Sequence, residues 1–444
     1  MAMERSYPAV LADRYAELAP TLAHHSVGWL NRLREESAAR YRSAGLPTPR
    51  VEAWRFTNLK DLVATDFALA QALPPVALDS LPRSSLLAVN GHVLAFVNGK
   101  LRADLSTLDD LPAGVTLLPL SEALRREEGI LSAHLGRVVE TVENPFIDLN
   151  TALMEDGIVL SLAEGAVLDK PLHIVSIGVS TQGGDKPVAF FPRLLAVLGK
   201  NARATIFESH AGIGDGAYLS AMLSEIRLEE GAHLEHYQLQ NEGRAAFHIA
   251  NAYAQLAAGA VYDHFALQIG SRLSRNEVHA ALLGEGARCH MNGAYLGLDK
   301  QHLDSTTFID HAVPGCSSRE VYKGVLDGQA HGVFQGKILV RRDAQQTDGH
   351  QLNRALLLSR GAEVNAKPEL EIYADDVKCS HGATVGELDE TQLFYLQARG
   401  IDRDSARALL IEAYVQEALD EIGNAEARLP FQRLVGGWLK SRKD

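Results

Sequence analysis

A short corner sequence that recurs through the second half of the chain limits what this protein can fold into. Gly or Asn followed by Ala stands at 165–166, 201–202, 231–232, 259–260 and 286–287, roughly 27 to 36 residues apart, and again at 361–362. Gly and Asn accept the positive φ that a sharp bend needs, and the small Ala lets stacked turns approach closely. Alternating apolar and polar residues follow the corners, as they do in strands.

Strands joined by regularly spaced corners predict a solenoid, in which each coil buries its inner face on its neighbours. A twisted meander or a β-sandwich would show similar corners, so the spacing alone leaves those folds open. We expect the strand-rich core to cover residues 157–387, with a helical and mixed region at 1–156 and a helical region at 388–444.

The flanking regions show helical periodicity and capping residues. We expect helix within 7–44 and at 121–128, and short strands around Asn98-Gly99. At the other end, Asp389 can cap a helix over 390–399, and Asp402 can cap a second helix to about residue 422. The spacing in this second helix predicts one apolar side made of Ala406, Leu409, Leu410, Ala413 and Leu419.

Charge and cysteine content narrow the class of protein. The net charge is -13, without an offsetting basic stripe, which argues against a nucleic acid partner. We expect neither an apolar signal segment nor a membrane span. The three cysteines, Cys289, Cys316 and Cys379, are far apart in the sequence and form no C-x-x-C pair, which fits a reducing compartment. The composition therefore predicts a cytoplasmic protein.

The segment 366–388, which contains Cys379-Ser380-His381-Gly382-Ala383-Thr384, resembles the signature of the SufB/SufD family of iron–sulfur cluster assembly scaffold proteins. Residues 331–337, 346–348, 356–359 and 393–401 are similar to the same family, and so is the N-terminal stretch 52–57 around Trp54. Within the family the cysteine and the glycine of this segment match the SufD form, because SufB typically lacks that cysteine and carries Glu after the histidine.

The resemblance implies a right-handed parallel β-helix between helical termini. It also implies a complex with a SufB-like paralogous scaffold, contacted through the β-helix, and with a SufC-like ATPase, contacted through the C-terminal helices. A homodimer is an alternative assembly. Cluster assembly would then take place at the interface of the two scaffolds, and this chain would act as a scaffold subunit rather than as an enzyme.

Cys379 and His381 are the candidate ligands for iron or for a transient iron–sulfur cluster. Residues two apart in a strand lie on one face, about 6.5 Å apart along the chain, and Ser380 lies on the other face. Thiolate and imidazole both bind iron, and a partner would complete an incomplete ligand set. The alternative is that Cys379 is a small buried apolar residue and His381 a hydrogen-bonding residue.

Other motifs are weaker. Residues 332–338 are one position short of a P-loop and lack its Ser or Thr, so we expect no nucleotide to bind this chain. Trp54 either forms a docking patch or anchors the N-terminal region.

Two other functions stay open: an interaction platform that contributes no ligand, and a β-helix carbohydrate-active enzyme. The adjacent Asp375 and Asp376 disfavour the enzyme, because neighbouring strand residues face opposite ways.

Overall fold

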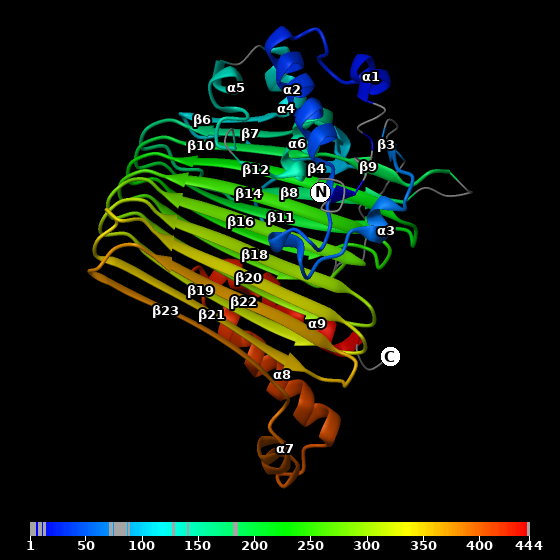
Figure 1. Cartoon of the computed structure of the whole chain (residues 1–444), viewed down its shortest axis with the longest axis vertical. Helices are drawn as coiled ribbons and strands as arrows, with labels where there is room; N and C mark the ends of the chain where they lie inside the picture. Colours follow the sequence, from blue (N-terminus) through cyan, green and yellow to red (C-terminus); the bar gives the residue numbers. More distant parts are fainter. Residues whose placement is uncertain are drawn as a thin grey trace.

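In the computed structural model the strand-rich part of the chain forms a parallel β-solenoid of about seven turns over residues 172–386 (Figure 1). The structure describes residues 6–7, 11, 15–70, 74, 87, 89–126, 129–139, 142–180 and 185–441. The predicted parallel β-helix is confirmed, and its predicted right-handedness stays a prediction. No helix among these residues is long and apolar enough to cross a membrane.

Each coil contributes one strand to each of two sheets, and the coil strands of a sheet run parallel to one another. The first sheet contains β7 (Gly157–Leu162), β10 (Arg193–Leu198), β12 (Tyr218–Leu228), β14 (Phe247–Leu256), β16 (Leu273–Leu282), β18 (His302–His311), β20 (His331–Val340) and β22 (Glu363–Ile372). The second sheet contains β8 (Leu172–Val179), β11 (Arg203–Ile213), β13 (His233–Asn241), β15 (Val261–Gln268), β17 (Arg288–Gly297), β19 (Ser317–Leu326), β21 (Thr347–Leu357) and β23 (Val377–Gly386).

The predicted corners stack along one edge of the solenoid. The corner residues at 165, 201, 231, 259 and 286 all have positive φ, between 56° and 71°. The backbone N–H of Gly231 donates to the carbonyl of Ala258 in the next corner at 2.8 Å, and Gly259 repeats the contact with Glu285 at 2.9 Å. Each following Ala is buried, so the small residue lets the coils approach as expected.

The sixth predicted corner does not belong to this stack. Gly361 lies between β21 and β22, at the opposite edge, and its φ is not positive. The stack continues instead through Gly315, with a φ of 70°, and Gln346, with a φ of 59°. The buried Cys316 takes the place of the small Ala. The motif gave a wrong prediction here because glycine occurs in the corners at both edges of the solenoid.

The N-terminal region covers the outer face of the first sheet. Trp54 is buried, lies 4.1 Å from the Arg275 guanidinium, and has its ring centroid 5.5 Å from that of Phe146. The anchoring role considered for Trp54 is therefore what the structure shows. The elements of this region are β1 (Ser6–Tyr7), α1 (Tyr15–Leu18), η2 (Ala19–Thr21), α2 (Gly28–Ala44), β2 (Leu46–Pro47), η3 (Glu52–Trp54), α3 (Lys60–Val63), β3 (Ala68–Leu69), β4 (His92–Val97), β5 (Lys100–Leu101), η6 (Ala103–Leu105), β6 (Val115–Pro119), α4 (Leu120–Arg125), α5 (Gly129–His134) and α6 (Pro145–Leu153). Strands β3, β6 and β9 (Val188–Phe190) join the first sheet, and β4 and β5 extend the second sheet beyond β8.

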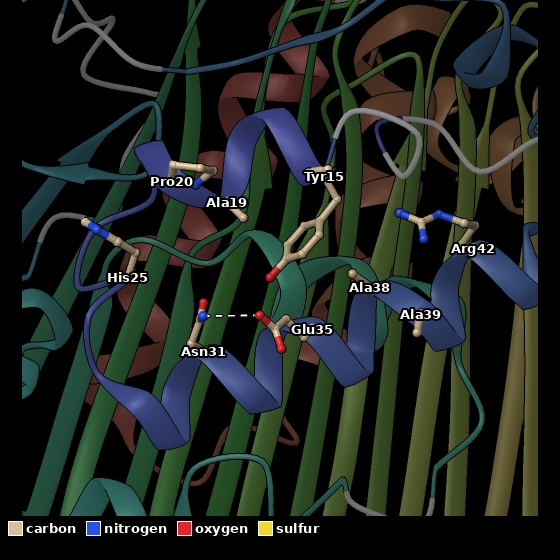
Figure 2. A pocket seen from close by; sticks show the side chains of 10 residues that line it. Tyr15, Ala19, Pro20, His25, Asn31, Glu35, Ala38, Ala39 and Arg42 are labelled. Carbon is tan, nitrogen blue, oxygen red and sulfur yellow. Dashed lines mark hydrogen bonds between the residues drawn. The ribbon is translucent and has the colours of Figure 1, made fainter.

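The helix expected within 7–44 is broken in the part that the structure describes. Pro20 lies in η2 and His24 has a φ of 59°, so the chain turns before α2 begins. A groove of about 520 Å³ runs between α1, η2 and α2, and Asn31 donates to Glu35 at 3.2 Å on its wall (Figure 2). This groove lies on the N-terminal helices, and no cysteine lines it.

Three helices follow the solenoid: α7 (Glu390–Gln397), α8 (Arg403–Leu419) and α9 (Ala425–Ser441). Asp389 and Asp402 cap α7 and α8 as predicted, accepting from the N–H groups of Thr391 and Ser405, whereas α9 was not predicted. Helices α8 and α9 pack on the outer face of the second sheet, and α7 projects at the end of the molecule (Figure 1). A buried Lys323 on β19 pairs with Glu417 of α8 at 2.5 Å.

Candidate functional site at the open end of the solenoid

Cys379 and His381 lie on the last strand of the solenoid and share its inner face. Strand β23 pairs with β21 in the register Gly349↔Cys379 and Gln351↔His381. Ser380 lies on the outer face, where its hydroxyl is 2.7 Å from His350 Nδ1. Cys379 is partly buried against the interior core, and His381 is exposed. The structure therefore presents a thiol and an imidazole on one face, at the end of the solenoid interior.

This end of the solenoid is open. Strands β22 and β23 are the last strands of their sheets, so each has one unpaired edge. Tyr373, Val385 and Ile372 are 64%, 50% and 39% exposed, whereas the strands of the earlier coils are largely buried. Unpaired strand edges with exposed apolar side chains are uncommon on an isolated protein surface and are typical of a surface that a partner covers.

All three cysteines lie along one edge of the solenoid, although their sequence positions look scattered. Cys289, Ser318, Gly349 and Cys379 form one column of the register across β17, β19, β21 and β23. Cys316 lies in the adjoining corner. Burial raises the pKa of each of the three thiols above its ordinary value. The sequence offered no signal for this proximity, because it depends on the register of coils about 30 residues apart.

The interior of the earlier coils, at β11, β13 and β15, is lined with polar side chains. Glu208 lies 2.8 Å from His236 Nε2 and 3.1 Å from His210 Nε2. Burial acts to raise the pKa of Glu208, but the two imidazoles outweigh it and hold that pKa below its usual range. His264 is 3.1 Å from Gln238. His236 and His264 thus hydrogen-bond to side chains of the preceding coil.

Two pairs of potential metal ligands that are close in the sequence, His233 with His236 and Cys289 with His290, lie on opposite faces of their strands. His236 points inward to Glu208, whereas His233 lies on the outer face, 2.8 Å from Asp263. Cys289 is buried inside, and its neighbour His290 contacts Asp263 outside at 2.6 Å. Over the described residues, no group of three or more His, Cys, Asp or Glu side chains is close enough to hold a metal ion. Any metal at Cys379 and His381 would therefore need further ligands.

The P-loop-like stretch is a strand. Residues 332–338 lie within β20, between β18 and β22, and Phe334 and Ile338 are buried. Backbone N–H groups committed to two neighbouring strands cannot wrap a phosphate, which a P-loop must do.

Comparison with known proteins identifies similar chains. A family model described as "SUF system FeS cluster assembly, SufBD core domain" matches residues 179–414, and one described as "SufBD protein N-terminal region" matches residues 4–174. An iron–sulfur cluster assembly SufBD family protein of Synechocystis is 34% identical over 88% of this chain and 86% of its own length. The iron–sulfur cluster assembly protein SufD of Escherichia coli is 31% identical over 88% and 90%. The chloroplastic protein ABCI7 of Arabidopsis thaliana is 31% identical over 92% and 86%.

Proposed function

Because the chain belongs to the SufBD family of iron–sulfur cluster assembly proteins, we propose that it is the SufD-like scaffold subunit of a SUF complex. Members of this family are scaffold components of the SUF system and are generally non-catalytic. Membership of the family therefore argues against a carbohydrate-active enzyme. The thiol, imidazole and glycine of Cys379-Ser380-His381-Gly382 favour the SufD form over the SufB form, as does the similarity to SufD of Escherichia coli. The cytoplasmic location stays a prediction.

The open end of the solenoid is the observation that carries this proposal. A paralogous SufB-like solenoid that pairs with β22 or β23 would continue the sheets and cover Tyr373 and Val385. The same contact would enclose Cys379 and His381 between the two chains. A second copy of this chain could occupy the same surface, which would give the homodimer.

The cargo is iron or a transient iron–sulfur cluster, bound at this interface. Cys379 supplies a thiolate once its proton leaves, and His381 supplies an imidazole from the same face of β23. Two ligands from this chain, with the rest from the partner, hold a cluster that must later be handed on. The ATPase that drives the cycle would be a SufC-like partner bound to the C-terminal helices.

The test compares iron and acid-labile sulfide in the anaerobically isolated complex for wild type, His381→Ala and Cys379→Ser. We expect His381→Ala to lower iron binding by at least the roughly 10- to 100-fold that the loss of an outer-shell partner of a ligand costs. Cys379→Ser should have a smaller effect, since Cys379 is also a partly buried core residue. The fold should be unaffected by the loss of the exposed His381, at under about 0.5 kcal/mol.

His350→Ala is the matched control. It removes a histidine of the adjacent strand that lies on the outer face, so iron loading should stay at the wild-type level. If His381→Ala assembles with its partners and loads iron as wild type does, the histidine is no ligand. The chain is then an interaction platform.

A further inference from the structure

A small cavity lies inside the solenoid, between the two sheets of the earlier coils. Its volume is about 10 Å³, which is room for one water molecule. His210 on β11 and Gln238 on β13 line it from the second sheet, and His248 on β14 and Asn276 on β16 line it from the first. These four side chains are buried, so a molecule in the cavity is out of contact with bulk solvent.

Hydrogen bonds connect three of the side chains around the cavity through the carboxylate of Glu208. Glu208 Oε2 accepts hydrogen bonds from His210 Nε2 at 3.1 Å and from Gln238 Nε2 at 3.0 Å. Gln238 Oε1 in turn accepts from Asn276 Nδ2 at 3.2 Å. The two ends of this chain of bonds are His210 Nδ1 and Asn276 Oδ1, and neither atom has a hydrogen-bond partner in the described part of the molecule. The chain of bonds is therefore one member short of a closed ring.

Both ends of this chain of bonds accept hydrogen bonds. Although burial acts to raise it, two imidazoles hold the pKa of Glu208 below its usual range, so the carboxylate only accepts and His210 Nε2 donates to it. Nδ1 of the neutral His210 ring is then an acceptor, as is the carbonyl oxygen of the Asn276 side chain. His210 and Asn276 are only 1% and 8% exposed, and buried polar atoms nearly always have a partner. A molecule with two donors, placed between the two acceptors, would satisfy both.

We propose that the cavity binds one water molecule, which donates one hydrogen bond to His210 Nδ1 and the other to Asn276 Oδ1. Water carries the two donors and fits a volume of about 10 Å³. A metal ion is the wrong class of ligand here, because the described residues that line the cavity include neither a carboxylate nor a thiolate. The site lies in the earlier coils and is independent of the cargo proposed for the open end.

The water would connect the two sheets of the solenoid. It closes the ring of Glu208, His210, Asn276 and Gln238, which ties β11 and β13 of the second sheet to β16 of the first. The direct bond between Asn276 and Gln238 is one such tie, and the water adds another. It also fixes the tautomer of His210, because the bond that one ring nitrogen makes decides which nitrogen carries the proton. The water is then part of the folded structure, as buried waters are in other proteins.

The test is a crystal structure of the full-length chain at a resolution that shows ordered water. We expect one density peak within about 2.7–3.2 Å of both His210 Nδ1 and Asn276 Oδ1. Asn276→Leu should lose this peak, because leucine removes the acceptor and fills the space with apolar atoms. Gln238 Oε1 keeps a partner in this variant, His264 Nε2 at 3.1 Å. His210 Nδ1 is left without one, so the thermal unfolding temperature should fall.

Asn353→Leu is the matched control. Asn353 is a buried asparagine of β21 that donates to Tyr295 Oη at 3.1 Å and lies outside the lining of the cavity, so the water peak should stay. A wild-type cavity without the peak overturns the proposal, whether or not the variants fold. A peak that remains in Asn276→Leu, or one that is lost in both variants, overturns the assignment of Asn276 as a partner of the water.

Discussion

The interior of the solenoid strongly changes the pKa of a single buried carboxyl group, that of Glu320. Its Oε2 accepts a hydrogen bond from Gln351 Nε2 at 2.7 Å, while its Oε1 has no partner among the residues the structure describes. Burial raises the pKa of Glu320 to about 7. Glu208, in the same interior, is held ionised by two histidines. Glu320 has no histidine beside it in the described part of the chain. It is therefore buried as the protonated, uncharged carboxyl group, which costs less free energy than burying a carboxylate.

We expect Glu320→Gln to stabilise the fold increasingly as pH rises. The native state keeps the Glu320 proton up to pH about 7, whereas the unfolded chain releases it near its ordinary value of about 4.3. Between these values the native state binds more protons, so rising pH destabilises wild type and not the glutamine variant. The gain should grow from about 1 kcal/mol at pH 5 to about 4 kcal/mol above pH 8. Urea unfolding of both proteins at the two pH values measures it, and a gain that is constant with pH would contradict the assignment.

At the scale of residues, sequence reasoning placed Cys379 and His381 on one face of a strand but missed the register column that Cys289 and Cys379 share. Alternation within one strand is a local property, so it can be deduced from residues two apart. Cys289 lies 90 positions before Cys379 in the sequence, and the two residues share a column only through the stacking of the coils.

At the scale of elements, the C-terminal helices differ in burial: α8 and α9 pack on the solenoid, whereas α7 carries exposed aromatic side chains. Ile411 and Val415 of α8 are buried with Phe431 of α9 against the second sheet. In α7, Phe394 and Tyr395 are 67% and 59% exposed. Removing all three helices would uncover the solenoid face that α8 and α9 protect, so point substitutions on α7 are the sharper test of partner binding.

We expect Phe394→Ala combined with Tyr395→Ala to abolish co-purification of the ATPase. Exposed aromatic side chains are the usual anchors of an interface, and the loss of such an anchor typically costs about 2 kcal/mol or more of binding free energy. The thermal unfolding temperature should not change, since neither ring is buried. Leu429→Ala on α9 removes another exposed apolar side chain and serves as the control. Undiminished ATPase recovery with the double variant would rule out α7 as the docking element.

Five of the six predicted corners and both helix caps were correct, while the predicted packed face of α8 was not. Corner glycines and Asp caps act through the local backbone, so their identity carries the information. The predicted apolar side of α8 included Leu409, yet Leu409 is 47% exposed and Ile411 is buried instead. An amphipathic helix with apolar residues on more than one side is oriented by the surface it packs on, here the second sheet and α9. The sequence of the helix alone carries no information about that surface.

At the scale of the whole molecule, the two ends of the solenoid differ. The first coils are covered by the N-terminal helices and strands, whereas β22 and β23 end their sheets without a further strand (Figure 1). Repeat proteins need a covering at each end to stay soluble. The uncovered end is thus where assembly with another chain is expected.

We expect Tyr373→Glu combined with Val385→Glu to prevent association with the paralogous scaffold and, if the chain dimerises alone, to give monomers. Burying two new carboxylates in the interface would cost several kcal/mol, while the isolated chain leaves both positions exposed and should stay folded. Light scattering on the co-expressed and the isolated chains measures the mass. Leu283→Glu, at an exposed position in a corner before β17, is the control. A complex of unchanged mass would exclude this end as the interface.

The attachment of Trp54 and Thr57 to the middle of the solenoid has a consequence for synthesis on the ribosome. Thr57 hydrogen-bonds to Asp304, 247 residues later. At about 5–20 residues per second, the nascent N-terminal segment waits roughly 12 to 50 seconds before its docking surface exists. A coil partner such as Tyr237 for Phe207 follows after only 30 residues, so each coil can pair as it emerges. The segment around Trp54 is therefore translated early and can dock only after Asp304 has been made, with its apolar residues open to chaperones and proteases in between.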